Sequence, residues 1–277
     1  VARYHDDTPE TFSRQEARDL VPASNPLLQH FFDHIAGANF DKRLGYIVDE
    51  LCEVFAVADV RKIMEQHYGK MTLWGEEKES PDPVIHFYED FLKEYDPGQR
   101  VARGAFYTPL PVVRFIVRSI DVILKRDFGL LAGLADTTKA ETLVTVQGKK
   151  RKEPVHRVQI LDPAVGTGTF LNETIRFIHK SFNGQGGRWT SYVDDELLPR
   201  LHGFELMMAP YTIAHLKLGM TLRDMGYEKF SRRLGVYLTN SLEEGYKEEE
   251  NLFTSLGFMK SVAEEAKDAS VIKNSRP

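Results

Sequence analysis

The stretch VQILDPAVGTGTFLNETIRFI, residues 158 to 178, constrains the fold more than any other part of the sequence. A short apolar run leads into Asp162 and Pro163, two glycines follow, and apolar residues then recur at helical spacing. This pattern predicts a strand, a tight turn and a helix. Gly166 and Gly168 let the backbone approach a ligand, and the following helix offers unpaired N–H groups at its start. The stretch therefore predicts a ligand site above the turn.

Strand and helix patterns alternate along the chain after residue 98. Such alternation predicts an α/β fold with a mainly parallel sheet that helices cover on both faces. Ligands bind such sheets at the carboxyl ends of the strands. The expected segments are a helix at 108–129, two strands around a Gly-containing turn within 141–161, a strand at 158–161, a helix at 168–182, a strand at 200–206, a helix at 209–226 and a strand at 234–242.

Residues 1–98 show helical patterns only. Amphipathic segments at 24–37, 42–69 and 82–98 predict helices, with Ser24 or Asn25 as the first cap, and a polar loop is expected at 75–83. The sequence therefore predicts two domains, a helical one at 1–98 and an α/β one at 99–277.

Composition excludes several classes of protein. The 277 residues are 42% hydrophobic, enough for a sizeable core, but no run of about 18 apolar residues occurs. The N-terminus is charged where a signal peptide would be apolar, so we expect a cytoplasmic protein without a membrane partner. Cys52 is the only cysteine, which excludes disulfides within the chain and thiolate zinc sites; we expect it in the core, and we expect no metal.

Charge is distributed unevenly. The net charge is −5, yet residues 100–157 hold twelve Lys and Arg against five Asp and Glu. This part of the chain can face a polyanion, or the basic run GKKRK at 148–152 can be a solvated hairpin tip; the sequence leaves both open.

Three strands end in polar residues at the expected binding edge: Asp162, Glu205 and Asn240. A carboxylate such as Glu205 can accept hydrogen bonds from both hydroxyls of a ribose. The three ends together predict a nucleoside pocket.

The glycine turn does not fit the common nucleotide motifs. A dinucleotide fingerprint needs glycine where the chain has Leu171, and a P-loop needs Lys and Ser or Thr where it has Thr169 and Phe170. Asp162 would repel a pyrophosphate but attract an ammonium or sulfonium group. S-adenosylmethionine is therefore favoured over NAD and ATP.

Each candidate also has a structural interpretation. Asp162 can cap the glycine turn, Glu205 can be an exposed strand-end charge, and Thr108 with Pro109 can be a helix cap and first helical residue. Tyr211 and His215 are expected in the core. The 43 residues between Asp162 and Glu205 exceed the usual spacing of about 20, so we expect an inserted surface loop and short helix at 183–200, with Trp189 in it.

Three motifs resemble one known family. ILDPAVGTGTF is similar to the Asp-Pro-Ala-x-Gly-Thr-Gly-Thr-Phe motif of amino-methylating DNA methyltransferases, GAFYTPLPVV to their Tyr-Thr-Pro element, and GFELMMAPYTIAHLKL to their Glu-bearing strand and helix. The order of the motifs is that of the gamma-type adenine-N6 methyltransferases of restriction-modification enzymes. FYEDFLKEYDP and YLTNSLEE most resemble the type ISP enzymes, in which a helical coupler precedes the methyltransferase domain.

The resemblance implies a Rossmann-like sheet that binds S-adenosylmethionine. Tyr107, Thr108 and Pro109 would contact its methionine end together with the glycine turn, Glu205 its ribose, Leu206 or Met207 its adenine ring, and Asn240, where many relatives have Asp, the adenine amino group. The residues that the resemblance assigns to the cofactor are Tyr107, Thr108, Pro109, Asp162, Pro163, Ala164, Gly166, Gly168, Glu205, Leu206 and Asn240.

The resemblance also implies a missing part. Enzymes of this kind carry an Asn/Asp-Pro-Pro-Tyr/Phe catalytic motif, and the 277 residues contain no Pro-Pro pair. We therefore expect an incomplete methyltransferase sheet without catalytic residues and inactive alone, from a larger restriction-modification polypeptide that methylates double-stranded DNA. A methyltransferase of RNA or protein, a non-catalytic S-adenosylmethionine sensor and a structural coupler remain as alternatives.

Overall fold

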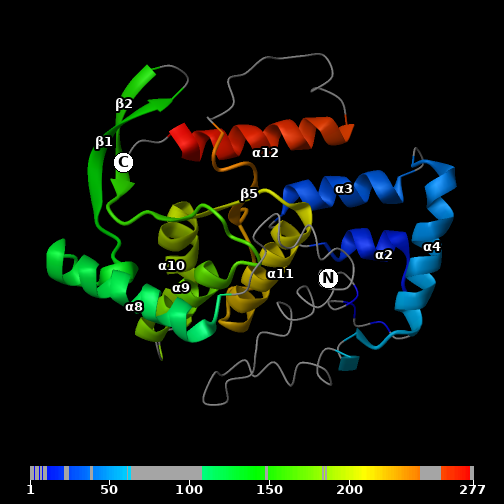
Figure 1. Cartoon of the computed structure of the whole chain (residues 1–277), viewed down its shortest axis with the longest axis horizontal. Coiled ribbons are helices and arrows are strands. Elements are labelled where there is room, and N and C mark those ends of the chain that lie inside the picture. The colour runs from blue at the N-terminus through cyan, green and yellow to red at the C-terminus, as the bar shows by residue number, and fades with distance from the viewer. Residues whose placement is uncertain are drawn as a thin grey trace. The chain divides into compact units, whose positions relative to one another are not determined.

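The computed structural model describes residues 11–21, 25–37, 40–60, 62–63, 108–146, 149–182, 184, 186–243 and 257–274, together with residues 3, 6 and 8 (Figure 1). The chain forms two compact units, Val1–Tyr107 with Leu256–Ser261 and Thr108–Ser255 with Val262–Pro277. The loop expected at 75–83, the helix expected at 82–98, the predicted domain boundary and Tyr107 lie outside the described residues.

The first unit contains helices α2 Arg14–Asp19, α3 Pro26–Ala36 and α4 Lys42–Val57. Each begins at a side-chain cap, and Asn25 rather than Ser24 caps α3, since its Oδ1 accepts from the N–H of Leu28 at 3.0 Å. Cys52 lies buried in α4, as predicted.

The second unit contains most of the predicted α/β elements. Its members are α8 Leu110–Asp127, η1 Gly133–Ala135, β1 Lys139–Val146, β2 Lys149–His156, β3 Ile160–Asp162, α9 Thr169–His179, η2 Lys180–Phe182, α10 Gly186–Tyr192, η3 Val193–Leu197, η4 Leu198–Arg200, β4 Leu201–Glu205, α11 Met208–Asp224, β5 Gly235–Leu238 and, from Val262 on, α12 Gly257–Asn274.

Two separate sheets form among these strands. β1 and β2 make an antiparallel hairpin, and β3, β4 and β5 make a parallel sheet in that order. The sequence therefore predicted correctly a mixed α/β unit with a parallel sheet, although the observed parallel sheet is small.

Helices cover both faces of the parallel sheet. A Cβ at Gly203 would lie 3.0 Å from Leu171 of α9, so this face lies against α9. The next residue, Phe204, points to the opposite face, where Phe204 and Tyr237 pack with Ala269 and Ile272 of α12. The sequence analysis did not anticipate α12.

The segment 183–200 differs from its prediction. It forms α10, the π-helix η3 and the 3-10 helix η4, and the side chain of Trp189 is fully buried, with its ring centroid 5.3 Å from that of Phe182 and 5.9 Å from that of Tyr192. The predicted short helix is confirmed by α10, but the expectation of a surface loop around Trp189 was wrong, because the glycines at the start of the segment hid a helical spacing of apolar residues. The buried apolar residues of this segment are Trp189, Tyr192, Val193, Leu197 and Leu198.

In the described part of the chain, every helix is too short or too polar to cross a membrane.

Candidate functional site

The ends of the three parallel strands meet at one edge, as the sequence predicted. Asp162 ends β3 and pairs in register with Gly203, whereas Glu205 ends β4 and pairs with Leu238. The N–H of Thr239, next to Asn240, donates to the carbonyl oxygen of Glu205 at 2.8 Å. We call this region the glycine-turn edge: Asp162 to Gly168, Glu205 to Met207, and Thr239 with Asn240.

Glu205 holds the glycine turn in place. Its Oε2 accepts from the N–H of Gly166 at 2.8 Å, and its Oε1 accepts from the N–H of Met207 at 2.9 Å. The residue is only 8% exposed, so its interpretation as an exposed strand-end charge was wrong. Each carboxylate oxygen has two lone pairs, and Glu205 therefore keeps acceptor capacity for a ligand.

Only one of the two carboxylate oxygens of Asp162 accepts a hydrogen bond in the described structure. Its Oδ1 accepts from the N–H of Ala164 at 3.1 Å, which is the turn-capping role. Its Oδ2 is buried and finds no hydrogen-bond partner among the residues that the structure describes. Burial raises the pKa of Asp162, and the charge of Glu205 adds to this. A cation or a hydrogen-bond donor would complete this site.

The two glycines of the turn serve different purposes. Both have left-handed backbones, with φ of +55° at Gly166 and +82° at Gly168. A Cβ at Gly168 would lie 3.3 Å from the Cβ of Ala214, so close packing against α11 explains this glycine. A Cβ at Gly166 would meet no atom of the described residues within 4 Å, so within the described structure space is left above Gly166 and not above Gly168.

Apolar and polar groups flank the two carboxylates. Leu206 is 58% exposed, and Pro163 and Ala164 are exposed as well. The side chain of Asn240 holds its own turn, since Nδ2 donates to Glu243 at 2.9 Å and Oδ1 accepts from the N–H of Leu242 at 3.1 Å. The assignment of Asn240 to an adenine ring remains a prediction.

Thr108 and Pro109 lie in the same unit but make no hydrogen bond to Asp162 or Glu205 in the described structure. Pro109, not Thr108, occupies the cap position of α8, and no side chain caps this helix. The interpretation of Thr108 as a cap was therefore wrong, and its cofactor role remains a prediction.

Gly203 is a packing position below the turn that the sequence analysis missed. A Cβ there would lie 2.2 Å from Cγ2 of Val165, so only glycine leaves room for Val165 below the turn. A glycine inside a predicted strand was the available signal. Tyr211 and His215 are buried, as predicted, and His215 Nε2 lies 3.1 Å from the carbonyl oxygen of Val236.

A model of the family described as N-6 DNA Methylase matches residues 79–275. The chain belongs to the N-6 DNA methylase family. The description of the family names DNA methylation as the activity of its members. Comparison with the curated proteins gave no significant match.

Two solved structures share the fold. One is a nuclease-deletion mutant of the Type ISP restriction-modification enzyme LlaGI in complex with a DNA substrate mimic, at 20% identity, a TM-score of 0.52, and coverage of 97% of this chain and 18% of that chain. The other is the ATP-dependent Type ISP restriction-modification enzyme LlaBIII bound to DNA, at 20% identity, a TM-score of 0.54, and coverage of 90% and 14%. This N-6 DNA methylase thus spans less than a fifth of either enzyme.

Proposed function

We propose that the chain is the S-adenosylmethionine-binding part of a DNA adenine-N6 methyltransferase from a restriction-modification system. The observation that carries this proposal is the buried Asp162 oxygen, which finds no partner among the described residues, in the same turn as Gly166, where an added Cβ would meet no described atom within 4 Å. S-adenosylmethionine carries an ammonium and a sulfonium group, and its sulfonium supplies the methyl group. The ammonium group could donate a hydrogen bond to Asp162, and either cation would stabilise the charge of this carboxylate.

The other residues of the glycine-turn edge fit the rest of the cofactor. Glu205 has lone pairs left for ribose hydroxyls, and the exposed Leu206 offers an apolar surface for a purine. A pyrophosphate would face the two carboxylates of Asp162 and Glu205, whose repulsion disfavours NAD and ATP. We include Tyr107, Thr108, Pro109 and Asn240 in this proposed site on the resemblance of the motifs alone.

Transfer to adenine requires groups besides these. The amino nitrogen of adenine is a poor nucleophile, and an enzyme must flip the base and hold its N–H groups with acceptors. The sequence holds no Pro-Pro pair, and we assign both carboxylates of the edge to the cofactor. We therefore propose that the catalytic loop and the target-recognition contacts belong to other parts of a larger enzyme, with residues 1–98 as a coupler-like helical domain.

Calorimetric titration with S-adenosylmethionine, NAD and ATP tests the cofactor proposal. We expect heat and a raised melting temperature with S-adenosylmethionine only; a ligand at 100 times its dissociation constant stabilises the fold by about 2.7 kcal/mol. Glu205→Ala should weaken binding, whereas Glu153→Ala, at an exposed position of β2, should not. Binding of NAD without binding of S-adenosylmethionine would show that the proposal is wrong.

Tritiated-methyl transfer tests the catalytic part. We expect no transfer to duplex DNA by the 277 residues, and transfer by a longer protein that adds an Asn-Pro-Pro-Tyr-like loop and a target-recognition domain. Transfer by the shorter chain would contradict the proposed division of labour. Cofactor binding without transfer by the longer protein would instead favour a sensor, and transfer to RNA alone would reassign the substrate.

A further inference from the structure

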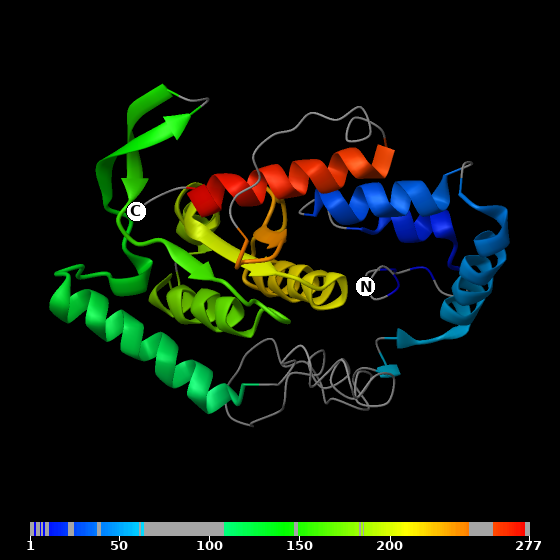
Figure 2. The same ribbon diagram turned by 45° about the horizontal axis from the view of Figure 1, so that its top comes forward.

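The hairpin of β1 and β2 is an appendage of the second unit. Its strands pair with each other and not with the parallel sheet, and in both views the hairpin extends away from α9 and α10 (Figures 1 and 2). The N–H of Arg157 donates to the carbonyl oxygen of Thr138 at 2.9 Å, so the chain is already closed at the base of the hairpin. A connection between Thr138 and Arg157 would need only a tight turn, and the two eight-residue strands are therefore not needed as a linker.

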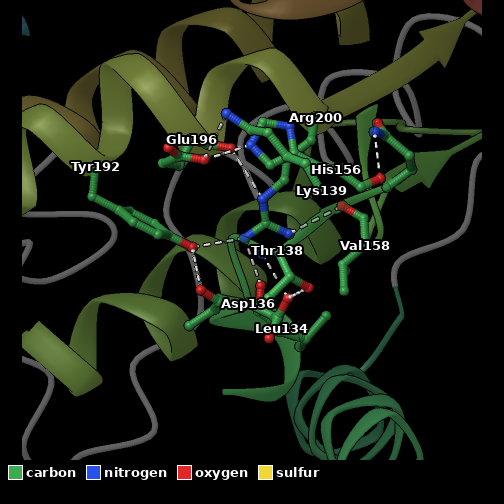
Figure 3. Close-up of polar contacts among 11 residues, drawn as sticks. Leu134, Asp136, Thr138, Lys139, His156, Val158, Tyr192, Glu196 and Arg200 are labelled. Atoms are coloured by element: carbon green, nitrogen blue, oxygen red, sulfur yellow. Dashed lines mark hydrogen bonds and ion pairs between the residues drawn. The ribbon is translucent and has the colours of Figure 1, made fainter. Parts of the chain in front are cut away.

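A buried arginine fixes this base. Arg200 is fully buried; its Nη2 donates to the carbonyl oxygen of Leu134 at 2.7 Å, before the hairpin, and its Nη1 to that of Val158 at 3.3 Å, after it (Figure 3). The same Nη2 donates to the hydroxyl of Tyr192 at 2.6 Å. The guanidinium of Arg200 thus links η4 to the chain on both sides of the hairpin, at Leu134 before β1 and at Val158 after β2.

The first residue pair of the hairpin is held as well. His156 Nε2 lies 2.5 Å from Glu196 Oε2, and Lys139 Nζ lies 3.5 Å from the same oxygen (Figure 3). Lys139 and His156 are partners in the β1–β2 register. The hairpin therefore leaves the unit from a base whose two strands are both anchored.

Positive charge gathers on one strand of this anchored hairpin. β2 contains four consecutive cations, Lys149 to Lys152, against the single acid Glu153, whereas β1 contains one cation and one acid. Lys152 is exposed. Four strand residues span about 10 Å at roughly 3.4 Å per residue.

We propose that β2 of this hairpin contacts the phosphate backbone of duplex DNA. B-DNA presents one charge per about 1.7 Å of axis, so a strand that carries four cations over about 10 Å would pass several phosphates, whereas a free phosphate could pair with few of them. A two-stranded ribbon also fits the major groove, which is about 12 Å wide. The choice of DNA rests on the proposed function, but the contact itself needs neither cofactor nor methyl transfer.

Salt-dependent binding of a 20 bp duplex by the 277-residue chain, without S-adenosylmethionine, tests the proposal. The hairpin variant replaces Lys149, Lys150, Arg151 and Lys152 by Gln, and the control variant replaces the exposed Arg126, Lys180, Lys229 and Arg232 by Gln. Each phosphate contact contributes about 0.9 to the slope of log K against log salt, and alternate residues of a strand face opposite sides. With two to four contacts, the hairpin variant should lose about 1.8 to 3.6 units of slope. The control, with the same net charge, should lose less than about one.

A gain of binding separates contact from misfolding. Glu153→Gln removes the exposed acid next to the four cations and should tighten binding by about two- to five-fold. A misfolded hairpin cannot produce this result. Equal slopes for hairpin and control variants, or no effect of Glu153→Gln, would show that the basic run is a solvated tip. Because cofactor is absent throughout, this outcome would leave the cofactor proposal standing.

Discussion

Two carboxylates of the second unit, Glu265 and Asp162, lie in contrasting surroundings. Glu265 of α12 is 3% exposed, and its Oε2 lies 2.8 Å from Nη2 of Arg233. Its Oε1 accepts from the hydroxyl of Tyr211 at 3.1 Å and from the N–H of Leu238 in β5 at 3.0 Å. Asp162, at the glycine-turn edge, has one backbone donor and one oxygen without a partner in the described structure.

The difference separates a carboxylate that holds the fold from one that is available to a ligand. Glu265 pairs with a cation and satisfies an N–H of the edge strand β5, so its charge is balanced within the chain. Among the residues that the structure describes, Asp162 forms no ion pair, and the like charge of Glu205 raises its pKa further. An uncompensated buried charge lowers the stability of the fold. We therefore expect such a charge only where a ligand supplies the missing partner.

The largest loss of stability is expected on substitution of Glu265, because both of its carboxylate oxygens have partners within the chain. Glu265→Ala leaves Arg233 with one carboxylate fewer and leaves Tyr211 and the N–H of Leu238 without this acceptor. We expect the free energy of unfolding to fall by about 3 to 5 kcal/mol, measured by denaturant titration.

Asp268 provides the matched control for this change. It also binds Arg233, at 2.9 Å, but its side chain is 48% exposed. Asp268→Asn should lower the free energy of unfolding by less than about 1 kcal/mol. Equal losses of stability for the two substitutions would mean that the buried carboxylate of Glu265 does not hold the fold more than an exposed one.

A smaller effect, of the opposite kind, is expected at Asp162. Asp162→Asn keeps an acceptor for the N–H of Ala164 but removes the charge, so the cofactor-free protein should be as stable as the wild type or more stable. Affinity for S-adenosylmethionine should fall by about 10- to 100-fold, as for the loss of a hydrogen bond to a charged group. Calorimetry on Asp162→Asn and on Asp195→Asn, an exposed control, measures both quantities. A large loss of stability at Asp162 with unchanged affinity would mean that it holds the fold, like Glu265.

The sequence predicted the glycine-turn edge with Asp162 but not the contacts of Glu265 between α12 and β5. The strand, the glycine turn and the ends at Asp162 and Glu205 follow from local patterns, because alternating strands and helices of an α/β unit bring their carboxyl ends together. The β1–β2 hairpin was likewise visible in a Gly-containing turn between strand-like runs.

The β5–α12 side depends on contacts that no local pattern reports. Glu265 and Arg233 lie 32 residues apart, and α12 has too few apolar residues to predict its packing on Phe204 and Tyr237. Glu173 is a second example. It follows the glycine turn on α9, where the sequence alone suggests a surface position, but it is 7% exposed and its Oε1 lies 3.8 Å from Nε of Arg114 in α8.

The pH dependence of Asp162 gives the smallest and most specific test. Because burial raises the pKa of Asp162 above its ordinary value of 3.8, its contribution to stability is fully present below 3.8 and is lost as the pH rises through the raised pKa. The stability advantage of Asp162→Asn over the wild type should therefore grow from acid toward neutral pH. Binding of a cationic ligand has the opposite sign, because only the ionised carboxylate attracts it.

The wild type should therefore lose affinity for S-adenosylmethionine on acidification from about pH 7 to about pH 4.5, whereas Asp162→Asn should lose less. Titration of both proteins across this range removes the contribution of the ligand's own ionisation, which is the same in both. Parallel affinity profiles would mean that the unpaired oxygen of Asp162 does not face the cofactor. A stability difference that shrinks toward neutral pH would mean that its carboxylate is stabilised by the chain, as that of Glu265 is.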